Sequence, residues 1–425
     1  DELLADLKRK MRGFDQNYLE LAVGYMNDGL LPEAEDVLTR YQGNNQEVKY
    51  YLGFIQDKKG NKSGAEKFFR EASGMAVDYG FPFRMESAKV FKLAAIYRPD
   101  DAKPLYYLGN LLYDKQPAKA IGYWEAAVKI DPSLAIAWRN IGFGYYHYAS
   151  DLKKAINAYE KAVSIKKDDP IYYAELDPLY EMNNTPVETR SKLFEGSHDV
   201  AKLRDDSFVR EVMVLNLSGQ SDKAVDYLKN SSFHFREGSS RVRDITVDAH
   251  LLLGKKYLSE GKYQQAQEQF FSVIDTPERG DFEGSTGDLR NPQINYYIGL
   301  TYEALGKKAE SKSYFSKSKD QVLQDISFIS YYQGLSLQKL GDKQKASELF
   351  NSLISEGDRK MSKDSDIDFF AKFGEREAEN VRLSNAYLLK GLGYKGIGDA
   401  ESATENLSKA VELSASNLWA NVEVK

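Results

Sequence analysis

The chain has 425 residues, a formal net charge of −6 and no cysteine. The lack of thiols excludes a disulfide framework, a Cys-ligated zinc site, an iron–sulfur cluster and thiol catalysis. The mild acidity argues against nucleic acid as a partner, and no run of about 18 apolar residues predicts a membrane span. A chain of this length exceeds one compact core, so we expect several domains or an elongated array of repeats.

One pattern recurs along the chain, beginning near residue 18. A large residue is followed after two residues by an aliphatic residue and a glycine, then by an aromatic residue, as in Trp138, Ile141, Gly142 and Tyr145. A second amphipathic run then begins at a small residue such as Ala155. Weaker copies begin near residues 173 and 208. The glycine recurs at Gly53, Gly109, Gly142, Gly254, Gly299, Gly334 and Gly391.

The spacing of three and four residues places the large side chains on one stripe of a helix. The glycine allows a paired helix to approach closely. Glycines in the turns, such as Gly261 and Gly341, end the first helix of a unit by adopting positive φ. A single helix pair cannot bury its own stripe, so neighbouring pairs must stack. The pattern resembles the tetratricopeptide repeat, a helix–turn–helix of 34 residues. We therefore predict an all-α solenoid of about ten units that forms a right-handed superhelix with a concave inner face.

Four longer intervals interrupt the repeats. We expect insertions near 75–101, 231–247, 275–292 and 357–380, within an N-terminal set of units (1–230) and a C-terminal set (231–425). The insertions mix aromatic residues with charge and glycine, whereas plain solvent loops seldom contain phenylalanine. Insertions in a solenoid often lie on its binding face. The alternative is that these aromatic residues only pin long loops onto the helices.

Seven short segments along the chain carry a second resemblance: 18–22, 80–84, 106–114, 233–238, 295–299, 368–371 and 391–394. In their order and spacing the chain as a whole resembles the C-terminal tetratricopeptide region of proteins that carry the domain of unknown function 5107. In that family the repeats follow a large N-terminal β-rich domain. The resemblance implies a piece of a larger bacterial protein with a link to carbohydrate metabolism, and it leaves the compartment open between cytoplasm and periplasm.

Residues next to the packing positions of the first helices should point into the concave groove, where aromatic faces suit extended peptides and sugars equally. The alternative is that several of these tyrosines pack between neighbouring helices. The candidates in the groove are Tyr50, Phe54, Tyr106, Asn110, Tyr113, Arg139, Phe143, Tyr146, His147, Tyr296 and Tyr331. The second insertion adds Phe233, His234, Phe235 and Glu237.

Asn110 and Asn140 occupy places that match the tetratricopeptide domains of chaperone cofactors, which hold a peptide carboxylate. Tyr106, Ile171 and Glu175 stand where those domains need cations. Because a carboxylate needs compensating positive charge, the sequence argues against that class of ligand.

No motif indicates catalysis, a metal or another cofactor. Gly391, Gly393 and Gly396 match a dinucleotide-binding pattern, but they lie inside a predicted helix rather than between a strand and a helix. The acidic stretch at 364–368 lacks the glycine that a calcium loop needs at its turn. We expect a non-enzymatic scaffold that binds a partner protein or its own missing N-terminal β-rich domain. The alternative is the C-terminal half of a carbohydrate-active enzyme, whose insertions contribute to a carbohydrate-binding or active site.

Overall fold

The computed structural model describes residues 2–77, 80–231, 233, 240–274, 289–362 and 379–424. Within these ranges it contains 24 helices and no strand, which confirms the predicted all-α fold. No helix in the described part is both long and apolar enough to cross a membrane. The chain divides into two compact units, unit 1 (1–166) and unit 2 (167–425).

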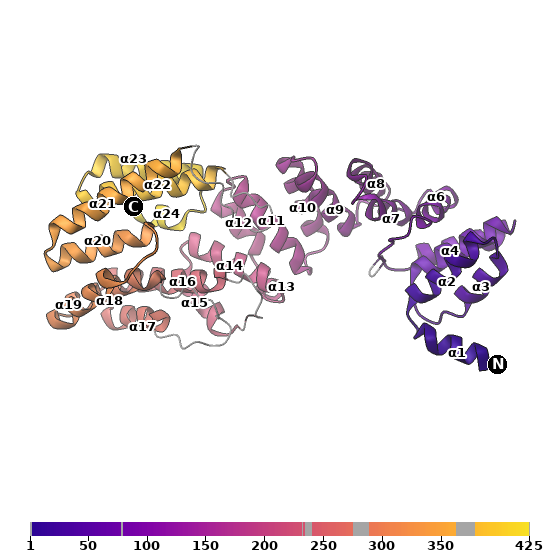
Figure 1. The fold of residues 1–425 in the computed structure, drawn as a ribbon, viewed down its shortest axis with the longest axis horizontal. Helices are drawn as coiled ribbons and strands as arrows, with labels where there is room; N and C mark the ends of the chain where they lie inside the picture. The colour runs from indigo at the N-terminus through magenta and orange to yellow at the C-terminus, as the bar shows by residue number, and fades with distance from the viewer. Residues whose placement is uncertain are drawn as a thin grey trace. The chain divides into compact units, whose positions relative to one another are not determined.

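Unit 1 contains four helix pairs and two additional helices (Figure 1). Helix α1 (Glu2–Met11) precedes the first pair, and α6 (Ser87–Tyr97) lies between the second and third pairs. The pairs are α2 (Asp15–Asn27) with α3 (Leu31–Thr39), α4 (Gln46–Lys58) with α5 (Lys62–Ser73), α7 (Lys103–Leu112) with α8 (Pro117–Ile130), and α9 (Ala135–His147) with α10 (Leu152–Ile165).

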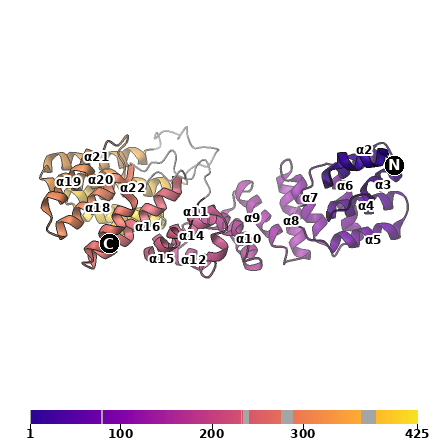
Figure 2. The ribbon, with the colours of Figure 1, turned by 90° about the horizontal axis from the view of Figure 1, so that it is seen from below.

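The described residues of unit 2 form six pairs. The two views agree in placing α20, α21 and α22 side by side (Figures 1 and 2). A short α13 (His198–Ala201) and a final α24 (Leu418–Glu423) lie outside the pairs. The pairs are α11 (Pro170–Met182) with α12 (Val187–Phe194), α14 (Asp205–Leu217) with α15 (Ser221–Lys229), α16 (Ser240–Ser259) with α17 (Tyr263–Ile274), α18 (Asn291–Ala304) with α19 (Lys308–Asp320), α20 (Phe328–Leu340) with α21 (Lys343–Met361), and α22 (Glu379–Ile397) with α23 (Ala400–Leu413).

The division expected between residues 230 and 231 falls inside unit 2. One cluster of buried side chains joins Phe208 and Val225 on one side of that point to Val242 and Ile245 on the other. The packing is therefore continuous there, and the separation into compact units falls between residues 166 and 167.

The glycine of the repeat lies against a large side chain of the paired helix. A Cβ at Gly109 would lie 2.2 Å from Nε1 of Trp124, and a Cβ at Gly334 would lie 2.3 Å from Cε1 of Phe350. The turn glycine Gly341 adopts a φ of 92° directly after α20. The small residue and the turn glycine thus have the roles that the sequence predicted.

The first predicted insertion, near 75–101, contains a helix as well as a loop. Val90 and Phe91 of α6 are fully buried, and the ring of Phe91 stacks 5.2 Å from that of Tyr107. In the loop before α6, Phe81 and Phe83 are 71 % and 58 % exposed. This insertion therefore extends the core of unit 1 and also presents aromatic surface.

Most of the other three insertions lie outside the described residues, including 234–239, 275–288 and 363–378. The predicted binding residues His234, Phe235 and Glu237 are among them. Phe233 is described, and its ring stacks 5.3 Å from that of Phe208. That contact fits the role of pinning a loop onto the helices.

Candidate functional site

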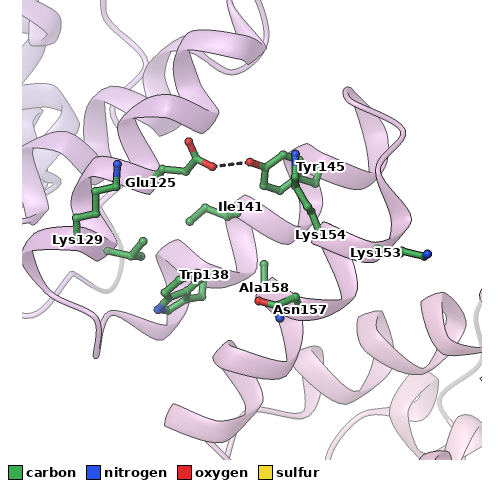
Figure 3. Close-up of a pocket in the computed structure, with 10 residues that line it drawn as sticks. Glu125, Lys129, Trp138, Ile141, Tyr145, Lys153, Lys154, Asn157 and Ala158 are labelled. Carbon is green, nitrogen blue, oxygen red and sulfur yellow. Dashed lines mark hydrogen bonds between the residues drawn. The ribbon is translucent and has the colours of Figure 1, made fainter.

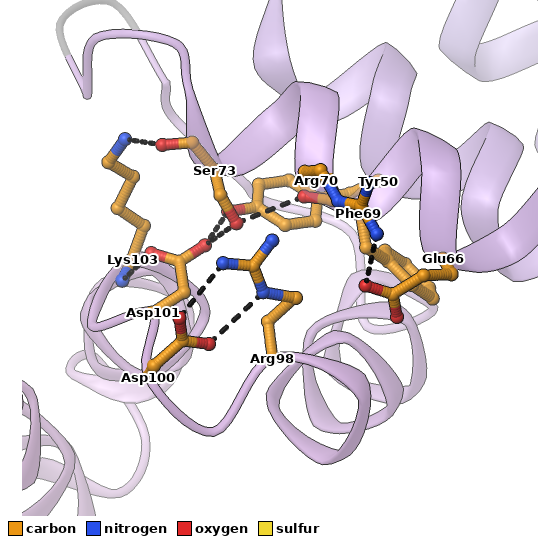
Figure 4. Close-up of polar contacts among 9 residues, drawn as sticks. All are labelled: Tyr50, Glu66, Phe69, Arg70, Ser73, Arg98, Asp100, Asp101 and Lys103. Atoms are coloured by element: carbon orange, nitrogen blue, oxygen red, sulfur yellow. Dashed lines mark hydrogen bonds and ion pairs between the residues drawn. The ribbon is translucent and has the colours of Figure 1, made fainter.

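Tyr50, a predicted groove residue, lies in the core of unit 1. Its side chain is 0 % exposed, and its hydroxyl donates to Oδ2 of Asp101 at 3.1 Å. Asp101 also accepts hydrogen bonds from the Ser73 hydroxyl and the Lys103 backbone N–H (Figure 4). Burial, followed by the charge of Asp101, raises the pKa of the Tyr50 phenol well above its ordinary value. Tyr50 is in the interior because Phe91 of α6 packs edge-on against its ring.

Two further candidates lie at the margin of this core. Tyr106 is buried, with its ring 5.2 Å from that of its neighbour Tyr107. Phe54 is half-buried, and the Lys58 ammonium lies 5.2 Å from the centre of its ring.

The α7/α9 strip is the place where the structure brings predicted residues together. The rings of Tyr113 and Phe143 lie 5.6 Å apart, and those of Phe143 and His147 lie 4.2 Å apart. The ring of Tyr146 lies 4.6 Å from that of His147. His147 is exposed and the other members are half-buried. The strip comprises Asn110, Tyr113, Arg139, Asn140, Phe143, Tyr146 and His147.

Polar groups line the same strip and are held in place by one another. Asn110 Oδ1 accepts hydrogen bonds from the Trp124 indole and from the Asn140 amide, both at 2.9 Å. Arg139 donates to Asn140 Oδ1 at 3.2 Å, and its guanidinium lies 5.2 Å from the ring of Phe143. Because the buried Trp124 fixes one end of this network, the amides and the guanidinium are presented in a defined orientation.

The candidates of unit 2, Tyr296 and Tyr331, lie beside the chain's own last helix. Their rings pack among Tyr297, Tyr332 and nearby phenylalanines at 5.4 to 5.9 Å. Burial, followed by the charge of Glu423 on α24, raises the pKa of both phenols. Helix α24 could not be predicted as part of a site, because its partners lie far away in the sequence.

A pocket of about 530 Å³ lies between α8, α9 and α10, and none of the predicted groove residues line it (Figure 3). Within it the Tyr145 hydroxyl donates to Oε1 of Glu125 at 2.5 Å, and this bond raises the pKa of Tyr145 to about 12. The Lys154 ammonium lies 5.0 Å from the centre of the same ring, and Trp138 forms part of the wall. This pocket could not be predicted from the sequence, because its lining residues occupy ordinary positions of the repeat.

The remaining sequence motifs have structural places. Gly391 and Gly393 lie inside α22, where added Cβ atoms would lie 2.6 Å from Leu407 and from Ile354, so their spacing serves helix packing. The acidic stretch at 364–368 lies outside the described residues. Elsewhere in the described ranges, no three His, Asp or Glu side chains come together in a group that could hold a metal ion.

Comparison with known proteins identifies the repeats. Two family models, both described as tetratricopeptide repeat, match the chain: one at residues 330–356, the other at residues 144–169, 292–320 and 384–417. Similar solved structures include YrrB, described as a TPR protein with an unusual peptide-binding site (16 % identity, 55 % of this chain and 92 % of that one, TM-score 0.29). MamA from Desulfovibrio magneticus RS-1 is 22 % identical, with 45 % of this chain and 96 % of that one covered and a TM-score of 0.26. PilF from Pseudomonas aeruginosa is 16 % identical, with 50 % of this chain and 88 % of that one covered and a TM-score of 0.28.

These structural likenesses are too distant to carry an argument about function. The family matches, by contrast, fall on helices that the structure pairs, from α9 with α10 to α22 with α23. The chain therefore contains tetratricopeptide repeats, an all-α fold typical of protein-interaction scaffolds.

Proposed function

We propose that this protein is a non-enzymatic interaction scaffold that binds a segment of a partner protein along the α7/α9 strip. The observation that carries the proposal is the row of rings from Tyr113 through Phe143 to His147, with neighbouring centroids 4.2 to 5.6 Å apart. The guanidinium of Arg139 lies over this row. Two successive repeats supply the row, so a ligand would contact both at once.

The chemistry of the strip suits an extended peptide. Half-buried rings offer faces for apolar side chains, and a ring–ring contact contributes about 0.5–1.5 kcal/mol beyond its buried area. The amides of Asn110 and Asn140 can exchange hydrogen bonds with a peptide backbone. The guanidinium of Arg139, which donates to Asn140 and lies over the ring of Phe143, gives this apolar face a polar edge.

Two more specific expectations, the source of the partner segment and the carbohydrate-active alternative, remain predictions. The partner segment could belong to the protein's own N-terminal β-rich domain, which the family resemblance implies. The carbohydrate-active alternative relies on His234, Phe235 and Glu237, which lie outside the described residues. Rings such as Phe143 also stack on sugars, so a carbohydrate ligand is one outcome of the test below.

The test starts from a library of random twelve-residue peptides displayed on phage, selected against the whole chain. The best peptide is then titrated by fluorescence anisotropy against the Arg139→Ala/Phe143→Ala double variant. We expect at least a tenfold loss of affinity, which corresponds to about 1.4 kcal/mol. Lys161→Ala/Ser164→Ala, two exposed positions on α10 outside the pocket of Figure 3, is the matched control and should bind like the wild type.

Equal affinity of the strip variant and the wild type would reject the proposal, as would the absence of any selected peptide. A glycan array probed with the same proteins covers the alternative. Glycan binding that is lost in the Arg139→Ala/Phe143→Ala variant would favour the carbohydrate function over the peptide function.

A further inference from the structure

Helix α24 packs on α14, α22 and α23 of unit 2, and side chains of α16 and α20 also reach it. It has only six residues, from Leu418 to Glu423, yet Trp419 and Ala420 are buried. A helix this short has almost no stability of its own in water, so its neighbours determine its place. We call the side chains that contact Trp419 and Glu423 the α24 seat; they come from α16, α20 and α22 and from Arg290, directly before α18.

An aromatic and cationic cage holds the indole of Trp419. Its ring stacks on that of Phe328 at 6.2 Å, with the planes 21° apart. The guanidinium of Arg290 and the ammonium of Lys255 lie 5.7 and 5.6 Å from its centre. The indole N–H donates to Oδ1 of Asp248 at 3.0 Å. The cage thus recognises both the face and the single donor of an indole.

Two lysines bind the carboxylate of Glu423, whose side chain is only 9 % exposed. The ammonium groups of Lys255 and Lys395 lie 3.3 and 2.8 Å from its oxygens. Burial alone would raise the pKa of this carboxyl, but the two cations bring it below its ordinary value. Trp419 and Glu423 are four residues apart, so both project from one side of α24.

The backbone before α24 is also bound by side chains. The Asn184 amide donates to the carbonyl of Glu412 at 2.7 Å and accepts from the N–H of Ala415 at 2.6 Å. Arg190 donates to the hydroxyl of Ser416. Because an Asn side chain can both donate and accept, Asn184 alone satisfies two backbone groups of this segment.

We infer that the α24 seat is a recognition site for a short helix that carries an indole and, four residues later, a carboxylate. Helix α24, Leu418–Glu423, occupies this site in cis. A partner that uses the site must carry the same pair of side chains and must displace α24. The inference is independent of the proposed function, because it concerns unit 2 and none of the residues of the α7/α9 strip.

The test uses the full chain and a fluorescent synthetic peptide of residues 412–424. The Trp419→Ala/Glu423→Lys variant removes the indole and opposes Lys255 and Lys395 with a third cation, so α24 should leave its seat. We expect this variant to bind the peptide at least tenfold more tightly than the wild-type chain, in which the tethered α24 competes at high effective concentration. A peptide with Glu423→Lys should bind the variant at least tenfold more weakly than the native peptide.

A charge exchange provides the decisive control. A chain that carries Trp419→Ala, Glu423→Lys, Lys255→Glu and Lys395→Glu should prefer the Glu423→Lys peptide over the native one. A folded double variant, judged by far-UV circular dichroism, that binds neither peptide or binds both equally would overturn the inference. If the double variant does not fold, Glu423→Gln replaces it, and equal binding of the native peptide to Glu423→Gln and wild-type chains would overturn the inference.

Discussion

The two units build their helix pairs by one rule but differ in what covers their predicted binding residues. In unit 1 the α7/α9 strip keeps His147 exposed and Phe143 and Tyr146 half-buried. In unit 2 the corresponding residues Tyr296 and Tyr331 lie beside Glu423 of α24. The comparison teaches that the repeat pattern sets the packing within a pair, whereas segments outside the pattern decide which surfaces remain accessible.

The interiors also differ in charge. In unit 1, buried Tyr50 donates to Asp101. In unit 2, the fully buried Asp177 binds two cations: its oxygens lie 2.7 and 2.9 Å from the Arg190 guanidinium and 2.5 Å from Nε of Arg210. A second bond joins Arg210 to Glu181 at 2.6 Å. These ion pairs connect α11, α12 and α14.

The largest expected effect comes from a substitution that breaks this network. Asp177→Ala removes the carboxylate that two buried guanidinium groups share, so the free energy of unfolding of unit 2 should fall by about 3–5 kcal/mol. Urea titration followed by circular dichroism measures the change. Asp199→Ala is the control, because its carboxylate pairs with Lys202 at the surface, where solvent screens the pair, so the free energy of unfolding should hardly change. A loss below 1 kcal/mol for Asp177→Ala would show that the network is not stabilising.

A smaller effect should distinguish unit 1 by its response to pH. Glu47 is 3 % exposed, and burial, followed by the charge of Asp15, raises its pKa to about 7. The folded state therefore holds a proton that the unfolded state has released, so the contribution of Glu47 to stability falls as pH rises from about 4.5 to 7. The difference between these pKa values corresponds to roughly 3 kcal/mol.

Glu47→Gln should abolish this fall and stabilise unit 1 above pH 7, with little change at pH 4.5. Urea unfolding in a Trp419→Phe background, where Trp124 and Trp138 are the remaining tryptophans, measures unit 1 by fluorescence across this range. The exposed Glu33→Gln serves as the control and should leave the pH dependence unchanged. Parallel pH profiles for Glu47→Gln and the wild type would contradict the assignment.

The smallest effect should be common to both units. Gly109→Ala in unit 1 and Gly334→Ala in unit 2 would each press a methyl group into a ring of the paired helix, at a cost of about 1–3 kcal/mol. Gly24→Ala is the control, because no atom lies within 4 Å of its added Cβ, and it should stabilise by about 0.5–1 kcal/mol. Melting temperatures of the three variants measure this. A cost in only one unit would mean that the units do not share one packing rule.

The sequence was sufficient for the fold because the decisive contacts are local. Gly109 and Trp124 lie in one helix pair, so their spacing alone predicts that they meet. Helix α6 was not predicted from the sequence, although the buried residues Val90 and Ala94, four positions apart, give it an apolar side. Because Phe91 of α6 packs on Tyr50, Tyr50 lies in the core, although the repeat periodicity placed it in the groove.

The candidate sites were predictable only in part for the same reason. Asn110, Tyr113 and Phe143 follow from their places next to the packing positions of successive repeats. The partners of Trp419 could not be inferred in this way, because Asp248 lies 171 residues earlier. Ion pairs such as Asp177 with Arg210 have no local signature either, since their spacing matches no helical period.

The closure of unit 2 has a consequence for synthesis on the ribosome. Ser416 and Ala415 hydrogen-bond to residues that precede them by 226 and 231 positions, whereas Gln46 and Tyr107 of unit 1 are 61 positions apart. The entropic cost of closing a loop grows with its length, and folding slows as contacts become less local. Unit 1 can complete itself while translation continues. The first pair of unit 2, α11 with α12, cannot complete its contacts until Ser416 has been synthesised, because Ser416 is one of the partners of Arg190.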